Sequence, residues 1–292
     1  MKVLGLKRER GLDGSFDFTG FLGISLLFGG LLLSINRAAH QQSLSGSVGG
    51  LLAALAGVAL LWRAATHAAS PIVDWGLFSR RNYLLALTLG MVRSFGLFGS
   101  VFLLPIYLQK VAGLDAMHTA LLILPAALSL AAASPLVGRL TGRFDTRLLA
   151  PVGIVLISLS MIWLRDLGPV APLGLIVTSQ IVRGLGMSLL ITPVMTVAMN
   201  DMPGERVGTA SGLITITMQL GGALGVAVLN GAMVNRSQAL GLSGELVAGD
   251  PLAAQAFGHA FQLASLVNFV GLVPALAFLP VAQPSPQQEA RA

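Results

Sequence analysis

The 292-residue chain is 54% hydrophobic and only 10% charged, with a mean hydropathy of +0.81. Soluble domains carry about 25% charged residues, so this composition excludes a soluble globular protein and predicts an all-α polytopic membrane protein. The net charge of +6 does not indicate nucleic-acid binding, because the basic residues are scattered between apolar segments. The sequence has no cysteine, which excludes disulfides and thiolate metal sites, and its four histidines lack metal-ligand spacing, so we expect no metal and no cofactor.

Residues 1–82 predict a two-helix hairpin followed by a linker. Four basic residues precede the first apolar run, residues 18–35, which places the N-terminus in the cytoplasm. No small-residue cleavage site follows the run, so it is a first membrane span rather than a signal peptide. A shorter apolar segment, residues 48–62, completes the hairpin. In the linker, residues 71–78 predict a short helix at the membrane interface, with Trp75 and Phe78 toward the headgroups.

Residues 83–281 predict a bundle of six further spans, followed by a polar tail at residues 282–292. The spans are expected at residues 83–108, 119–137, 148–164, 173–199, 207–234 and 261–280. Residues 235–258 then form the longest outer loop. Of the 18 lysines and arginines, four lie on outer loops and two within spans, which leaves twelve on the inner side. This asymmetry predicts about eight transmembrane helices in the cell membrane, with both termini in the cytoplasm.

Two arginines fall within predicted spans. Arg93 lies about 15 Å along its helix from Tyr83, near the membrane midplane, where it faces a cavity or a partner helix, or else snorkels to the headgroups. Arg183 is either buried or caps the outer end of its span. All 12 acidic residues fall in predicted loops, so the counter-charge must come from other helices, a lipid or a substrate, with Gln180 as a weaker acceptor.

Further polar or soft side chains on apolar helices are candidates for contact with a substrate. They are Gln109, Thr192, Met195, Gln219 and Asn268. Hydrogen bonding between helices is the alternative role for the polar ones, and core packing the alternative for methionine. The seventh span also contains two G-x-x-x-G pairs, for which close helix packing is expected. The pairs are Gly208 with Gly212 and Gly221 with Gly225.

A short basic turn at residues 134–147 joins the fourth and fifth predicted spans. Its arginines recur at every fourth position, as Arg139, Arg143 and Arg147. Arginines in a short loop mark the cytoplasmic side, and that rule alone explains their charge. It leaves unexplained the spacing of Gly138 and Gly142.

The same turn resembles the G-x-L-a-D-R-x-G-R-[RK] signature of the major facilitator superfamily, which lies between the second and third spans of each six-helix half. The matching residues are Gly138, Leu140, Arg143 and Arg147. The turn departs from the signature at Gly142, where the family has Asp, and at Asp145, where it has Gly. A reduced copy of this kind resembles the one in the C-terminal half, so the charge-relay lock of the N-terminal copy is not implied.

Three other stretches resemble the fourteen-span drug:proton antiporters of the EmrB/QacA type. They are L-F-G-S-V-F-L-L-P-I-Y-L-Q at residues 97–109, R-G-L-G-M at 183–187, and G-E-R-V-G-T-A-S-G-L with Q-L-G-G-A-L-G-V-A within 204–227. In that family two extra spans separate the six-helix halves, as the hairpin does here. The resemblance therefore covers the extra pair and the C-terminal bundle, and implies a missing N-terminal six-helix half as partner.

The resemblance implies proton-driven efflux of small hydrophobic or cationic compounds by two halves that rock around a midplane cavity. Two other hypotheses remain open, a membrane scaffold that does not transport and a homodimeric half-size transporter. No nucleophile, acid pair or metal cluster is apparent in the sequence, so an enzyme is not expected.

Overall fold

The structure is a computed structural model that describes residues 17–39, 44–67, 75–141, 146–200, 207–242 and 247–277. Every regular element in these ranges is helical, which confirms the predicted all-α fold. The long helices are α1 (Phe18–Ala39), α2 (Leu44–His67), α4 (Arg81–Ile106), α5 (Ala116–Thr141), α6 (Thr146–Ile162), α7 (Leu173–Asn200), α8 (Val207–Ala239) and α9 (Pro251–Val270). The short ones are α3 (Trp75–Phe78), α10 (Leu272–Leu276), the π-helical turn η1 (Tyr107–Val111) and the 3₁₀ turn η2 (Trp163–Asp166).

The described helices form a polytopic membrane fold. Seven of them are long and apolar enough to cross a bilayer. The second predicted span belongs to α2, a 24-residue helix, but its apolar part is only Val48–Ala64. Seven of the eight predicted spans therefore have membrane-crossing length, and the second is shorter.

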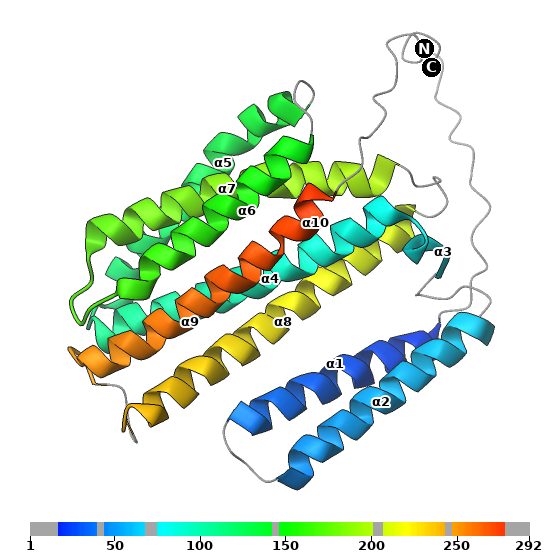
Figure 1. The fold of residues 1–292 in the computed structure, drawn as a ribbon, viewed down its shortest axis with the longest axis horizontal. Coiled ribbons are helices and arrows are strands. Elements are labelled where there is room, and N and C mark those ends of the chain that lie inside the picture. The colour runs from blue at the N-terminus through cyan, green and yellow to red at the C-terminus, as the bar shows by residue number, and fades with distance from the viewer. Residues whose placement is uncertain are drawn as a thin grey trace, which may run out of the picture.

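The long helices run nearly along one common axis (Figure 1). α4 packs against α8 and α9, while α7 packs against α5 and α6. Contacts of α6 with α9 and of α4 with α7 join these two groups into one bundle. The α1–α2 hairpin lies at the side of the bundle, where α1 contacts α8 (Figure 1).

Glycines in α8 let it lie directly on α4. A Cβ atom at Gly221 would collide with the backbone of Met91, and one at Gly225 with the backbone of Phe95. The other predicted pair behaves differently, because no described atom lies within 4 Å of a Cβ placed at Gly208 or Gly212. Close packing of that pair, expected from its spacing, is therefore absent from the described part of the chain.

The R-G-L-G-M stretch packs α7 between two neighbours. Gly184 lies against the backbone of Ala126 in α5, and Gly186 lies against the carbonyl oxygen of Gly153 in α6. Residues two apart on a helix point in widely different directions, so each glycine serves a different neighbour. The motif thus fixes the position of α7 in the bundle.

The hairpin is also held by backbone contact. Gly30 of α1 lies against the backbone of Gly50 and Ala54 in α2, and Gly57 of α2 lies against that of Gly23 and Leu27 in α1. In each helix the two glycines are seven residues apart, which keeps them on one face. This spacing was not among the predicted packing contacts.

Several predicted boundaries differ from the structure. The last span begins at Pro251 and not at residue 261, because Asp250 caps α9 by accepting the N–H of Leu252 at 2.8 Å and Pro251 occupies the first turn. The expected outer loop is therefore shorter at both ends, since α8 continues to Ala239. The basic turn is shorter too, because α5 continues to Thr141 and α6 begins at Thr146.

In the predicted interfacial segment, the structure describes the four-residue helix α3, in which Leu77 is fully buried. The side chain of Phe78 is partly buried against the core. The rest of the expected interfacial helix, residues 71–74 and the side chain of Trp75, lies outside the described residues, as does the polar tail.

Replacing Gly221 with Leu should destabilise the folded chain, because the new side chain has no room against the backbone of α4. Overpacking of this kind costs about 1–3 kcal/mol. We expect a lower melting temperature in detergent, measured by the loss of the monodisperse peak in size-exclusion chromatography.

Gly212→Leu is the matched control, since it adds the same side chain to the same helix where no described atom is within 4 Å. Its melting temperature should stay close to that of the wild type. Equal stability of the two variants would contradict the observed packing of α8 on α4.

Candidate functional site: a pocket with one arginine

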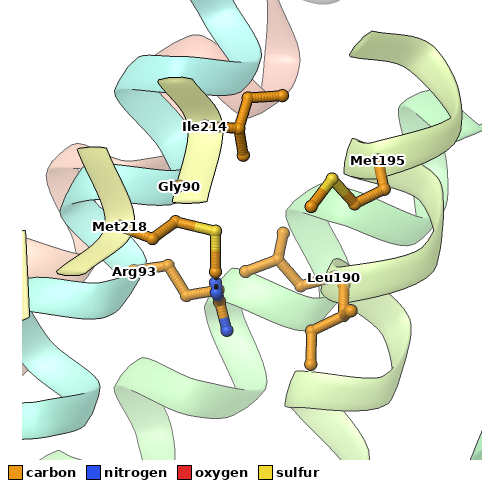
Figure 2. Close-up of a pocket in the computed structure, with 7 residues that line it drawn as sticks. Gly90, Arg93, Leu190, Met195, Ile214 and Met218 are labelled. Carbon is orange, nitrogen blue, oxygen red and sulfur yellow. Dashed lines mark hydrogen bonds between the residues drawn. The ribbon is translucent and has the colours of Figure 1, made fainter. Parts of the chain in front are cut away.

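A pocket opens between α4, α7 and α8. It contains about 300 Å³ of empty space, part of which is open to the outside. Its lining residues are Gly90, Arg93, Leu190, Ile191, Met195, Ile214 and Met218. Figure 2 shows the side chains of Arg93, Met218, Met195 and Leu190 converging on this space from three helices. The wall is therefore apolar except for one guanidinium group.

Arg93 lies inside the bundle, with only 5% of its surface exposed. It is 12 residues, or about 18 Å, from the start of α4 at Arg81. Its Nη2 donates to Met218 Sδ at 3.6 Å, and a thioether is a weak acceptor. Of the two interpretations open from the sequence, burial beside a cavity describes this side chain, and snorkelling does not.

The packing of α8 on α4 places this arginine beside Met218. The Tyr83 hydroxyl donates to the carbonyl oxygen of Ala210 at 2.9 Å and joins the starts of the two helices. Further along, Gly221 packs on the α4 backbone at Met91. Between these points Met218 lies over Gly90, where a Cβ atom would come within 3.2 Å of Met218 Cγ.

Arg183 is the second buried arginine, also 5% exposed. It lies ten residues inside α7, so the alternative that it caps the outer end of the helix is wrong. Its Nε and Nη1 atoms have no hydrogen-bond partner, and neither has either amide atom of Gln180, one turn away. The weaker acceptor expected from Gln180 is thus not engaged.

Asn268 is fully buried on α9 and contacts other helices, not the pocket. Its Nδ2 donates to the carbonyl oxygen of Ala264 at 2.9 Å and to Met161 Sδ at 3.5 Å. The amide lies where a side chain at Gly96 of α4 would be. Nearby, the Ser265 hydroxyl donates to the carbonyl oxygen of Ser158 in α6 at 2.9 Å. These contacts correspond to the alternative role of hydrogen bonding between helices.

The other predicted residues that the structure describes do not line the pocket. Gln109 and Gln219 are exposed, and neither is among the lining residues of this pocket. In the basic turn, Gly138 and Arg139 are exposed at the end of α5. The residues 142–145, and with them Gly142, Arg143 and Asp145, lie outside the described residues, as do the side chains of Arg147 and Thr192.

Of the pocket residues, Arg93 and Met195 were predicted from the sequence as candidates. Leu190, Ile191 and Ile214 have no feature that distinguishes them from other apolar residues in spans. They form one pocket wall only because the fold brings their helices together. Gly90 alone carried a signal, because it lies one turn from an arginine within a span.

Comparison with known proteins identifies the family of this fold. The chain matches the Major Facilitator Superfamily over residues 11–226. It belongs to that superfamily. This match confirms the resemblance of the basic turn and places the pocket in a membrane transporter fold, so its context is a lipid bilayer.

Named relatives in the major facilitator superfamily include proteins of multidrug resistance. The chain is 32% identical to the multidrug resistance protein Stp of Mycobacterium tuberculosis over 60% of this chain and 34% of that protein. It is 30% identical to the multidrug resistance protein B homolog of the same organism over 74% and 41%. It is 25% identical to the multidrug export protein EmrB of Haemophilus influenzae over 80% and 47%. The chain thus spans about a third to a half of the length of these relatives.

Replacing Arg183 with Met should stabilise the chain, because the substitution removes a buried charge whose nitrogens lack partners while keeping most of the side-chain volume. An unsatisfied buried group costs about 1–3 kcal/mol, so the melting temperature in detergent should rise by a few degrees.

Arg165→Met is the control, since the Arg165 side chain is 52% exposed and its ion pair with Asp166 is long, at 3.5 Å. It should leave the melting temperature nearly unchanged. A lower melting temperature for Arg183→Met would mean that this arginine has a stabilising partner.

Proposed function

We propose that this chain is part of a proton-coupled multidrug efflux antiporter of the cell membrane and that it exports small hydrophobic compounds. The pocket between α4, α7 and α8 carries the proposal, because it is an apolar site with one buried charge inside a major facilitator bundle. The names of the multidrug resistance and export relatives support the same substrate class. Nothing in the proposal requires an enzymatic step.

The chain would act together with a six-helix N-terminal half, either on the same polypeptide or on another. Two observations support this arrangement. The relatives are about two to three times as long as the regions that match. In addition, the acids in the described residues lie at helix ends. A proton-binding carboxylate deep in the membrane would therefore have to come from outside the described helices.

Fusion of the chain to the N-terminal six-helix half of a multidrug export relative should give efflux that an uncoupler abolishes. The measurement is loss of Nile red, a neutral dye, from cells that lack their own main exporters. The 292-residue chain alone should give none. Uncoupler-sensitive efflux from the chain alone would contradict the need for a second half and favour a homodimer. No efflux from a folded fusion would favour a scaffold.

Within the fusion, Arg93→Ala should lower efflux by about tenfold or more, because Arg93 is the charged group of the pocket. Arg165→Ala is the matched control, since that side chain is largely exposed near η2. Equal efflux by the two variants would show that the pocket arginine has no part in transport.

The proposed orientation has both termini and the α5–α6 turn in the cytoplasm. The chain contains no cysteine, so single introduced cysteines report sidedness without background. Thr141→Cys, at the end of α5, should react with a membrane-impermeant maleimide only after the cells are permeabilised. Val170→Cys, exposed between η2 and α7, should react in intact cells. The reverse pattern would invert the proposed topology.

A further inference from the structure

The guanidinium of Arg93 is a buried cation without an anionic partner in the described residues. Its one hydrogen bond there goes to the Met218 thioether at 3.6 Å. A guanidinium has five N–H donors in a fixed fork, and a thioether satisfies at most one of them weakly. Most of the hydrogen-bonding capacity of Arg93 is therefore free on the wall of the pocket.

Acidic side chains of the described residues do not reach this wall. The four described acids are Asp17, Asp115, Asp166 and Asp250, and each lies at the end of a helix. Asp115 pairs with His118 at 2.6 Å, Asp166 contacts Arg165 at 3.5 Å, and Asp250 caps α9. None of the four is among the lining residues of the pocket.

The rest of the wall fits an apolar body of variable shape. Leu190, Ile191 and Ile214 offer aliphatic surface, and Met195 and Met218 adapt to different outlines. Charge selection is left to Arg93. A cationic ligand would bring a second positive charge into a site of low dielectric, where like charges repel strongly.

We propose that this pocket binds lipophilic organic anions, with the acidic group of the ligand on the Arg93 guanidinium and its apolar body against α7 and α8. A carboxylate or sulfonate matches the guanidinium fork through two parallel hydrogen bonds. The inference rests on the proposed transport function and names the charge of the transported compound. It departs from the cationic substrates that the family resemblance implies.

The test compares ligands that share one skeleton and differ in charge. The 292-residue chain is placed in lipid nanodiscs at pH 7 and dialysed to equilibrium against radiolabelled 4-phenylbutyrate, 4-phenylbutylammonium or neutral 4-phenylbutanol. Binding to empty nanodiscs is subtracted to remove partition into lipid. We expect 4-phenylbutyrate to bind at least about tenfold more tightly than the other two compounds. Equal binding of the three, or tighter binding of the ammonium compound, would overturn the inference.

Substitutions locate the effect. Arg93→Met should abolish the preference for the anion, Arg93→Lys should keep a weaker preference because it retains the charge without the fork, and Arg165→Met should leave the preference unchanged. An anion preference that survives in folded Arg93→Met would overturn the assignment to this pocket. If Arg93→Met does not fold, the comparison of the wild type with Arg93→Lys and the three-ligand comparison still decide.

The same dialysis on the fusion separates this inference from the proposed function. Retained anion preference supports the inference for the larger assembly. If the preference disappears there while dye efflux persists, a side chain of the added half neutralises Arg93; the inference is then wrong for the transporter and the proposed function stands. If the chain binds the anion but no fusion exports any compound, the pocket assignment holds and the transport proposal fails.

Discussion

Close contact between helix backbones is the constraint on which this structure depends. In a bilayer, apolar side chains gain little by leaving lipid for a neighbouring helix, so association relies on tight van der Waals contact and hydrogen bonds between helices. Gly221 and Gly225 bring α8 onto α4, and Gly184 and Gly186 bring α7 onto α5 and α6. The bundle is therefore built from two groups of helices, each held by glycine contacts.

This packing decides where charge can be buried. Placing an arginine at the centre of a span costs about 2.5–3.5 kcal/mol on insertion scales. Arg93 occupies such a position between the two groups, on the wall of the pocket between α4, α7 and α8. Arg183 lies in the α7 wall with nitrogens that lack partners. Because neither charge has a described acidic neighbour, both are costly to the folded chain and require an explanation in function or assembly.

Most of the fold could be predicted from hydropathy, because long apolar runs in a membrane protein have little choice but to form spanning helices. The start of α9 could not, since residues 251–258 were assigned to the outer loop and only the helix cap formed by Asp250 and Pro251 marks the helix start. The two glycine pairs of α8 also look alike in the sequence. Only Gly221 and Gly225 face another helix, and that difference depends on how the helix is rotated in the bundle.

The site was predictable only in part, for a related reason. A charged residue within an apolar span is conspicuous, so Arg93 could be found from the sequence. The wall opposite it comes from α7 and α8, about 100 or more residues away along the chain, and consists of ordinary span residues. Gln109 and Gln219 were conspicuous for the same reason as Arg93, yet both are exposed. Polarity within a span predicts that a residue matters but not which way it points.

The pocket combines loose selection by shape with strict selection by charge. Its apolar wall comes from methionine, leucine and isoleucine side chains, which accommodate many outlines at small cost. Its single cation lies beside Met218, where α8 packs on α4. A site built in this way can accept compounds of many structures, provided that they carry a negative charge that pairs with the Arg93 guanidinium. The breadth of such a site thus comes from its wall and its specificity from one residue.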